Sequence, residues 1–318
     1  MRALHIEKGA VHYSEEYPAP RPKDDEALIR VLVAGICNTD LEIIKGYMGF
    51  HGIPGHEFVG IIEECGERDL IGKRIIGEIN TGCGSCDYCL GGMKNHCPRR
   101  SVLGILNKDG AFADHLTLPA SNLHPIPDSI KDEEAIFVEP LAAACEVLEQ
   151  VAVGADERVC VLGDGKLGLL VGQVLAATGC NLVVAGRHRE KLAILKERGI
   201  GTTTGSDFNK EEFDVVVDCT GSSSGLETAL RIVEPRGKVV LKTTVAERGK
   251  VDLNQVVINE ISIIGSRCGP FPPAIDALEN GSVDVRPLIS TTFPLEEGLD
   301  ALSHASQKGV LKVILKMV

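Results

Sequence analysis

The sequence predicts an α/β protein of two domains, one β-rich and one built on a doubly wound parallel sheet. The chain has 318 residues, and at roughly 150 residues per domain this length favours two domains. Residues 1–140 contain short apolar runs separated by glycine and proline, a pattern typical of strands and turns. From residue 158 onward such runs alternate with helical stretches, and βαβ units of this kind favour a parallel sheet.

The expected elements also indicate where the domains divide. In the β-rich part, residues 27–34 and 58–64 are expected to be strands. The apolar run 310–315 has no helical stretch after it, so we expect this strand to return to the first domain. The expected domains are therefore 1–140 with 268–318, and 141–267. Within the second domain the sequence predicts strand 158–162, helix 167–178, strand 181–185, helix 190–198, strand 213–218, helix 226–233, strand 238–242 and strand 261–265.

Composition excludes several classes of function. The chain has 33 Lys and Arg against 45 Asp and Glu, a net charge of −12, whereas nucleic acids and anionic membranes bind to basic surfaces. We therefore expect neither partner. No apolar run approaches the ~18 residues that span a bilayer, and the N-terminal residues lack a signal core, which predicts a cytoplasmic protein. In that compartment, eleven cysteines favour thiols or metal ligands over a disulfide framework.

A glycine-rich turn follows the first strand of the second domain. Gly163, Gly165 and Gly168 form G-x-G-x-x-G between a strand and a helix. The first glycine permits a tight turn, the second lets a pyrophosphate approach the backbone, and the third lets the helix pack closely. Lys166 and Leu167 begin the helix, whose free N–H groups can bind phosphate. The pattern predicts a dinucleotide site; the alternative is a turn that merely needs glycine.

The next strand carries the signal for the choice of cofactor. An NAD site usually has Asp or Glu about 20 residues after the glycines, bonded to the ribose 2′-hydroxyl. Here the strand ends at Gly186, followed by Arg187, His188 and Arg189. A small residue removes the carboxylate that would repel a 2′-phosphate, and Arg187 can pair with that phosphate. The sequence therefore predicts NADP in preference to NAD, unless both arginines are simply solvated. Thr220, in a later strand-end loop, is expected near the cofactor.

Four closely spaced cysteines predict one metal site. Cys83, Cys86, Cys89 and Cys97 can wrap a single ion with tetrahedral sulfur ligands. All-cysteine ligation leaves no position open for water, so we interpret the site as structural zinc. Two alternatives remain from the spacing alone. His96 could replace Cys97 as a ligand, or the cysteines could hold an iron–sulfur cluster.

A second, dispersed set of candidate ligands consists of Cys37, His56, Glu57 and Glu139. A cysteine, a histidine and a carboxylate held at strand ends could bind zinc with one position free for water or substrate. Taken one at a time, the same residues could be a buried thiol, a histidine in a turn and surface carboxylates. The residues alone leave both interpretations open.

The motifs in combination resemble the zinc-dependent alcohol dehydrogenases, also called medium-chain dehydrogenases. The resemblance covers nearly the whole chain and rests on residues 35–40, 55–57, 83–97, 139–140 and 163–168. It implies a GroES-like catalytic domain that binds zinc, residues 1–140 with 268–318, and a Rossmann domain that binds NADP, residues 141–267. The motif Glu139-Pro140 is similar to the polyol, threonine and glucose dehydrogenase branches. Homodimers or homotetramers are implied.

The resemblance also implies roles for individual residues. Cys37, His56 and Glu139 would be ligands of the catalytic zinc, with Glu57 as an alternative ligand. Thr39 would supply the hydroxyl that relays the substrate proton, and Asp40 the carboxylate that orients the zinc-bound histidine. Lys312 would be a basic residue near the cofactor phosphates.

The implied reaction is the reversible, NADP-linked oxidation of an alcohol to a carbonyl compound by hydride transfer. The alcohol would be a polyol, a sugar, or another primary or secondary alcohol. Two alternatives are an NADPH-dependent reductase of aldehydes or ketones, and a redox sensor that binds zinc and NADPH without turnover.

Overall fold

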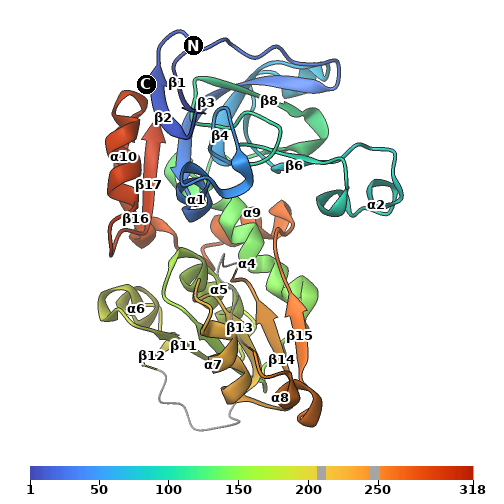
Figure 1. Cartoon of the computed structure of the whole chain (residues 1–318), viewed down its shortest axis with the longest axis vertical. Helices are drawn as coiled ribbons and strands as arrows, with labels where there is room; N and C mark the ends of the chain where they lie inside the picture. The colour runs from blue at the N-terminus through green and yellow to red at the C-terminus, as the bar shows by residue number, and fades with distance from the viewer. Residues whose placement is uncertain (206–212, 244–250, 318) are drawn as a thin grey trace. The chain divides into compact units, whose positions relative to one another are not determined.

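The computed structural model describes residues 1–205, 213–243 and 251–317, which belong to two compact units (Figure 1). The first unit comprises Met1–Glu139 and Leu288–Val318, and the second comprises Pro140–Pro287. None of the described helices is both long enough and apolar enough to cross a membrane.

The first unit is organised by a sheet of order β16-β17-β3-β4-β5-β9, with β8 also paired to β3. β3 runs antiparallel to both β4 and β17, with Gly35 opposite Glu57 and Ile36 opposite Val313. The end of β3 therefore lies beside the beginnings of β4 and β17. The strands are β3 (Glu26–Ile36), β4 (Glu57–Glu64), β5 (Arg74–Gly77), β8 (His115–Pro119), β9 (Leu123–Pro125), β16 (Ile289–Pro294) and β17 (Lys312–Lys316).

Smaller elements surround this sheet. Two pairs of short antiparallel strands are β1 (Ala3–Glu7) with β2 (Ala10–Ser14), and β6 (Asn80–Thr81) with β7 (Ser101–Val102). The α-helices are α1 (Asn38–Ile44), α2 (Asp87–Leu90), α3 (Asp132–Ala135) and α10 (Gly298–Ala305), the last packed on β17. Single 3-10 turns occupy Tyr47–Gly49, Arg68–Leu70, Lys94–His96, Ala120–Asn122, Arg286–Leu288 and Leu295–Glu297.

The second unit contains a parallel sheet of order β12-β11-β10-β13-β14-β15. The chain adds strands outward from β10 to β12 and then returns to the other side of β10. The reversal between β10 and β13 is the topological switch point, where such sheets bind ligands at the carboxyl ends of the strands. The strands are β10 (Arg158–Leu162), β11 (Asn181–Gly186), β12 (Gly201–Thr204), β13 (Phe213–Asp218), β14 (Val233–Leu241) and β15 (Ser262–Gly265).

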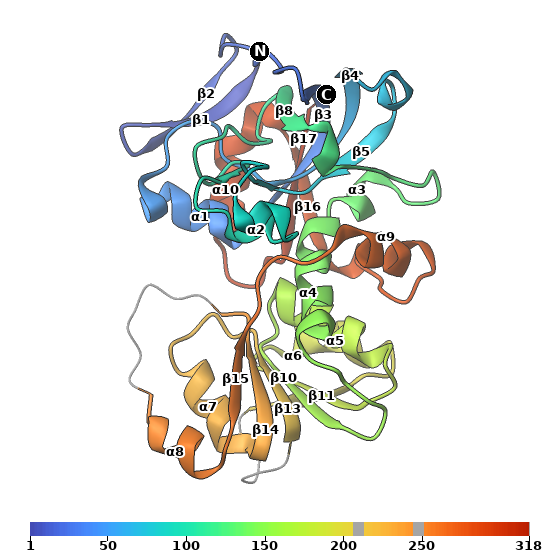
Figure 2. The same ribbon diagram turned by 90° about the vertical axis from the view of Figure 1, so that its right-hand side faces the viewer.

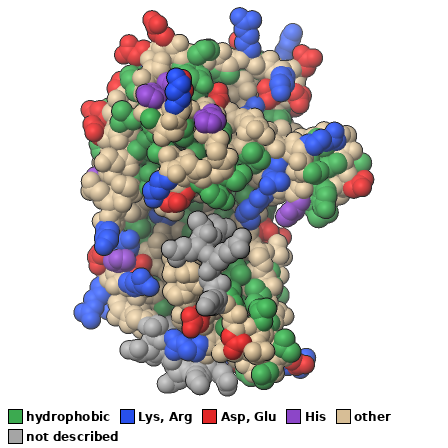
Figure 3. All heavy atoms as spheres, viewed as in Figure 1, with side chains coloured by type: hydrophobic (Ala, Val, Ile, Leu, Met, Phe, Trp, Pro, Cys, Tyr) green, Lys and Arg blue, Asp and Glu red, His purple; other side chains and the backbone are tan. Residues whose placement is uncertain are grey.

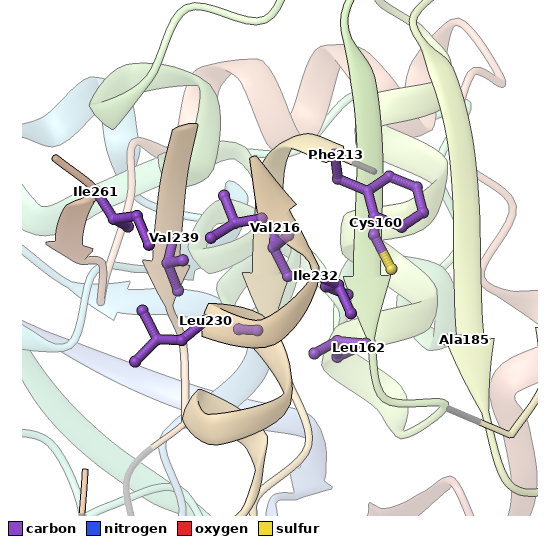
Figure 4. Close-up of a cluster of buried hydrophobic side chains, with 11 residues drawn as sticks. Cys160, Leu162, Ala185, Phe213, Val216, Leu230, Ile232, Val239 and Ile261 are labelled. Carbon is purple, nitrogen blue, oxygen red and sulfur yellow. The ribbon is translucent and has the colours of Figure 1, made fainter. Parts of the chain in front are cut away.

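Helices cover both faces of this sheet (Figure 2). Gly172 of α5 lies against Val184, whereas the next residue of β11, Ala185, belongs to a buried cluster with Leu230 of α7. Since neighbouring residues of a strand point to opposite faces, α5 and α7 cover different faces. Figure 4 shows the cluster beneath α7, which includes Cys160, Val216, Ile232 and Val239. The helices are α4 (Val138–Gln150), α5 (Lys166–Ala176), α6 (Arg189–Lys196), α7 (Gly225–Ile232), α8 (Leu253–Ile258) and α9 (Phe271–Glu279).

The predicted fold class, a β-rich domain with a doubly wound parallel-sheet domain, is confirmed. The division between the units differs from the sequence-based boundary at residues 267 and 268, because 268–287 belong to the second unit. Hydrogen bonds account for this difference. The Gln173 side chain donates to the Asp284 carbonyl and accepts from its N–H, and Arg198 donates to the carbonyls of Gly281 and Ser282.

Helix α10 allows a matched test of packing in the first unit. Leu302 is 7% exposed, whereas Leu299 on the same helix is 48% exposed. We expect Leu302→Ala to lower the free energy of unfolding by about 2–5 kcal/mol, because it removes buried apolar atoms and leaves a cavity. Leu299→Ala should change it by less than about 0.5 kcal/mol. Thermal and denaturant unfolding measure both; equal effects would contradict the packing described for α10.

Candidate functional site

A single carboxylate organises the end of β3. Cys37 follows this strand and precedes α1, and its backbone N–H donates a hydrogen bond to Asp40 Oδ2 at 2.7 Å. The other oxygen, Oδ1, lies 3.0 Å from Nδ1 of His56. Asp40 is 0% exposed and His56 is 3% exposed. The carboxylate therefore fixes both the start of the helix and the orientation of the imidazole, and leaves Nε2 as the ring nitrogen for a metal.

Cys37, His56 and Glu57 come together around this carboxylate. One potential ligand atom from each lies within 4.8 Å of the others. Thr39 Oγ1 lies 3.8 Å from Cys37 Sγ, so a hydroxyl also borders the group. Burial disfavours the imidazolium ion, but the Asp40 carboxylate outweighs it and raises the pKa of His56 well above its ordinary value. Sulfur, nitrogen and oxygen donors in this arrangement fit zinc.

Glu57 also explains the position of Lys312. The Lys312 ammonium forms an ion pair with Glu57 Oε2, and both residues are 1% exposed. Lys312 Nζ lies 5.3 Å from the centre of the Phe137 ring. The sequence places Lys312 near the cofactor phosphates as an expectation; in the structure it lies buried at the start of β17, which pairs with β3.

The other oxygen of Glu57 supports a metal at this place. Oε1 is buried and has no hydrogen-bond partner among the described residues. A buried carboxylate oxygen without a partner is costly, and a cation would satisfy it. Glu139, near the start of α4, lies outside the 4.8 Å group. Burial raises the pKa of Glu139, which also interacts electrostatically with His56 and Glu57.

The four cysteines around α2 form a second group. Cys83, Cys86, Cys89 and Cys97 all lie within 4.8 Å of one another, with sulfur–sulfur distances of 4.0 Å for Cys83 and Cys89 and 3.7 Å for Cys86 and Cys97. Zinc–sulfur bonds of about 2.3 Å in a tetrahedron place sulfurs roughly 3.8 Å apart. The distances therefore match one ion, whereas a cluster of several irons would hold the sulfurs further apart.

Neighbouring groups favour thiolate at this site. Hydrogen bonds from Ser85 lower the pKa of Cys83 to about 5. Arg99, which the sequence did not single out, donates to Cys83 Sγ at 3.1 Å. His96 is exposed and Cys97 is buried within the group, so the alternative in which His96 replaces Cys97 is wrong. All eleven cysteines lie in described parts of the chain, and none forms a disulfide.

In the second unit, the glycine-rich turn fits a dinucleotide. Gly163 has a φ of +116°, and a Cβ there would lie 2.5 Å from the carbonyl oxygen of Cys219. Around Gly165 a Cβ would meet nothing within 4 Å, which leaves open space beside the backbone. Lys166, Leu167 and Gly168 form the first turn of α5, where no side chain within the described ranges caps the helix. Backbone N–H groups at such an end suit a phosphate.

A carboxylate from the glycine-rich turn lies against the end of β11 and was not identified from the sequence. Asp164 lies between the first two glycines of the turn, and its Oδ2 accepts hydrogen bonds from the backbone N–H groups of Arg187 and His188, each at 2.6 Å. A Cβ at Gly186 would lie 2.5 Å from the same oxygen. The premise that this strand end lacks a carboxylate is therefore wrong. The sequence did contain a signal for this contact: an acidic residue inside the turn, together with a glycine at position 186 that leaves room for its side chain.

The remaining predicted residues lie near this turn or on the surface. Arg187 and Arg189 are exposed at the start of α6. Thr220 follows β13, and its hydroxyl donates to Asp218 Oδ1 at 2.8 Å. Its Cα would lie 3.1 Å from a Cβ at Gly163, so Thr220 borders the glycine-rich turn.

Comparison with known proteins gives matches along most of the chain. Residues 23–128 match the family described as "Alcohol dehydrogenase GroES-like domain", and residues 167–280 match "Zinc-binding dehydrogenase". The starvation-sensing protein RspB of Escherichia coli K12 is 31% identical, with 99% of each chain covered. An L-threonine 3-dehydrogenase of Coxiella burnetii is 31% identical over 94% of each chain, and a sorbitol dehydrogenase of Halalkalibacterium halodurans is 27% identical over 99% of each.

Solved structures agree with these matches. The rspB protein of E. coli CFT073, described as an alcohol dehydrogenase complexed with NADH, has a TM-score of 0.92 and 30% identity, covering 100% of this chain and 99% of that one. A protein of Sinorhizobium meliloti described as a zinc-binding dehydrogenase, bound to NADP, has a TM-score of 0.87 and 27% identity, covering 99% and 98%.

The role of Asp40 can be tested by measuring metal affinity. We expect Asp40→Asn to weaken binding of zinc or Co²⁺ at the Cys37 group by about 10–100-fold, because the imidazole loses the anion that orients it. Chelator competition followed by Co²⁺ absorption measures the change. Asp69→Asn, at an exposed position, is the matched control and should leave the affinity unchanged. An Asp40→Asn variant that is folded and binds as tightly as the native protein would refute this role.

Proposed function

Because the chain belongs to the family of zinc-dependent, medium-chain alcohol dehydrogenases, we propose that it catalyses the reversible NADP-linked oxidation of an alcohol to a carbonyl compound. The observation that carries the proposal is the grouping of Cys37, His56 and Glu57 around the buried Asp40 carboxylate. A histidine locked by a buried anion beside a thiol and a desolvated carboxylate is suited to hold a reactive metal in a fixed geometry.

We assign the catalytic zinc to Cys37, His56 and Glu139, with Glu57 as an alternative ligand. Support comes from the electrostatic interaction of Glu139 with His56 and Glu57 and from the unpartnered Oε1 of Glu57. When bound, zinc supplies a Lewis acid for the alcohol oxygen and the dinucleotide supplies the hydride acceptor. Thr39, whose hydroxyl lies 3.8 Å from Cys37 Sγ, accepts the hydroxyl proton of the substrate and passes it outward.

A second zinc, held by Cys83, Cys86, Cys89 and Cys97, is proposed to be structural. Four sulfur ligands saturate a tetrahedral ion, so no position remains for substrate. The lobe that carries them contains a four-residue helix, α2, and the strands β6 and β7 of two residues each. Elements this short bury little apolar surface, and the metal would supply the missing stability.

The dinucleotide is proposed to bind along the glycine-rich turn, with its pyrophosphate at the start of α5. A preference for NADP is supported by the exposed Arg187 and Arg189 beside Gly186, since guanidinium groups pair with phosphate. Structures of relatives hold either cofactor, NADH in one and NADP in another.

The substrate is proposed to be a polyol, a sugar or another small primary or secondary alcohol. Two relatives of this chain are named as dehydrogenases of sorbitol and of L-threonine, which both carry alcohol groups.

We also propose that the protein is a homodimer or homotetramer. Apolar side chains gather over α8 and the edge strand β15, at the lower right of Figure 3. They include Leu253, Val257, Ile258 and Ile263, which are all exposed. A monomeric mass in solution would contradict this assembly.

The reaction is tested with a panel of polyols, sugars, amino alcohols and simple alcohols, each with NADP and with NAD, followed by absorbance of the reduced cofactor. At least one substrate should be oxidised, faster with NADP. Cys37→Ser should lower kcat/KM at least about 100-fold while NADPH binding persists, because a serine hydroxyl is a poor zinc ligand. Cys65→Ser, outside both metal groups, is the control and should retain activity. Unchanged turnover in Cys37→Ser would overturn the assignment.

Metal analysis tests the two sites separately. We expect about two zinc ions per chain in the native protein and about one in Cys37→Ser. Removing a lobe ligand, as in Cys97→Ser, should also lose zinc and in addition lower the melting temperature, since that metal stabilises its lobe. Iron in the native protein, or one zinc per chain, would contradict the pair of sites.

A further inference from the structure

The loop between β11 and α6 contains an anion site that the protein fills with its own side chain. The backbone N–H groups of Arg187 and His188 point to one place, where each donates to Asp164 Oδ2 at 2.6 Å. The His188 ring adds Nδ1, 3.1 Å from Asp164 Oδ1. Asp164 is 8% exposed. Backbone N–H groups with flanking cations are the usual components of a phosphate site, and here a carboxylate occupies them.

The location of this carboxylate matters for the cofactor. In doubly wound sheets the pyrophosphate lies on the glycine-rich turn, and the adenosine ribose lies at the end of the second strand. In this chain that strand is β11, which ends at Gly186. A Cβ on Gly186 would lie 2.5 Å from Cβ of Asp164 and 2.5 Å from its Oδ2. The Asp164 side chain thus takes the space that a strand-end side chain would use.

The carboxylate remains charged in this environment. Burial opposes its ionisation, but hydrogen bonds from His188 and Arg187 outweigh that effect and lower the pKa of Asp164. A carboxylate at this position can accept a hydrogen bond from a ribose hydroxyl, whereas it repels a phosphate on the same hydroxyl. The exposed guanidinium groups of Arg187 and Arg189 act in the opposite direction.

We propose that Asp164 sets the discrimination between NAD and NADP. Its carboxylate accepts a hydrogen bond from the 2′-hydroxyl of NAD. It disfavours NADP in two ways: its negative charge repels the 2′-phosphate, and it occupies the backbone N–H groups that this phosphate would otherwise bind. The inference rests on the proposed function only in requiring that the chain binds a nicotinamide dinucleotide. The native preference is then a balance between Asp164 and the two arginines.

The geometry provides a variant that separates charge from structure. A single oxygen, Oδ2, accepts both backbone hydrogen bonds. The amide oxygen of asparagine can accept the same two bonds, so Asp164→Asn preserves the loop while removing the charge. Asp164→Ser, with a shorter neutral acceptor, is a second variant should the first fail to fold. Glu190→Gln is the matched control, because Glu190 is an exposed acid in the first turn of α6, whereas the hydrogen bonds described for Asp164 come from Arg187 and His188.

Calorimetric titration of the full chain with 5′-AMP and with adenosine 2′,5′-bisphosphate measures the effect without turnover. The ratio of the two dissociation constants reports the contribution of the 2′-phosphate alone. We expect Asp164→Asn to shift this ratio at least about tenfold toward the bisphosphate, and Glu190→Gln to shift it less than about twofold. NADH and NADPH binding, followed by fluorescence, should shift in the same direction.

The outcomes separate this inference from the proposed function. A folded Asp164→Asn variant with an unchanged ratio overturns the role of Asp164, whichever cofactor the native enzyme prefers. A native protein that prefers AMP contradicts the NADP preference, yet supports the role of Asp164 if the variant shifts the ratio. Failure of the native protein to bind any of these nucleotides overturns both.

Discussion

The two oxygens of the Asp40 carboxylate connect the fold of the first unit to its chemistry. One holds the N–H of Cys37, where β3 gives way to α1, and the other holds the ring of His56, directly before β4. A fully buried carboxylate requires partners for both oxygens, so the loss of either contact would leave one oxygen of a buried anion without a hydrogen-bond partner. The antiparallel register of β3 and β4 supplies the proximity, and the carboxylate converts that proximity into a fixed orientation.

The ion pair of Glu57 and Lys312 adds a second constraint of the same kind. Both charges are removed from water, a costly arrangement unless each is well partnered. Lys312 has the Glu57 carboxylate and the face of Phe137, whereas Glu57 has, among the residues that the structure describes, a partner for one oxygen only. The unpartnered oxygen of Glu57 makes this corner of the sheet a favourable place for a cation, because a positive group would satisfy that oxygen.

Much of the candidate site could be predicted because its chemistry is local in the sequence. The spacing of the four cysteines and the glycines after β10 each specify a geometry within one loop. Three features could not be predicted, because they depend on distant elements. Asp164 meets the loop after β11 only because Gly163 turns the chain with φ at +116° and Gly186 has no side chain. Lys312 faces Glu57 through strand pairing, and residues 281–284 join the second unit through bonds to Gln173 and Arg198.

The interior position of β17 has a consequence for how the protein is made. Residues 140–287 are continuous in sequence, so the unit they form can fold as soon as it leaves the ribosome. The sheet of the first unit has β17 between β16 and β3, and this strand is synthesised almost 280 residues after β3. Until then the end of β3 has an open edge, and Glu57 lacks its ammonium partner. The surroundings of Cys37, His56 and Glu57 in the first unit are therefore complete only once β17 has been synthesised, after all of residues 140–287.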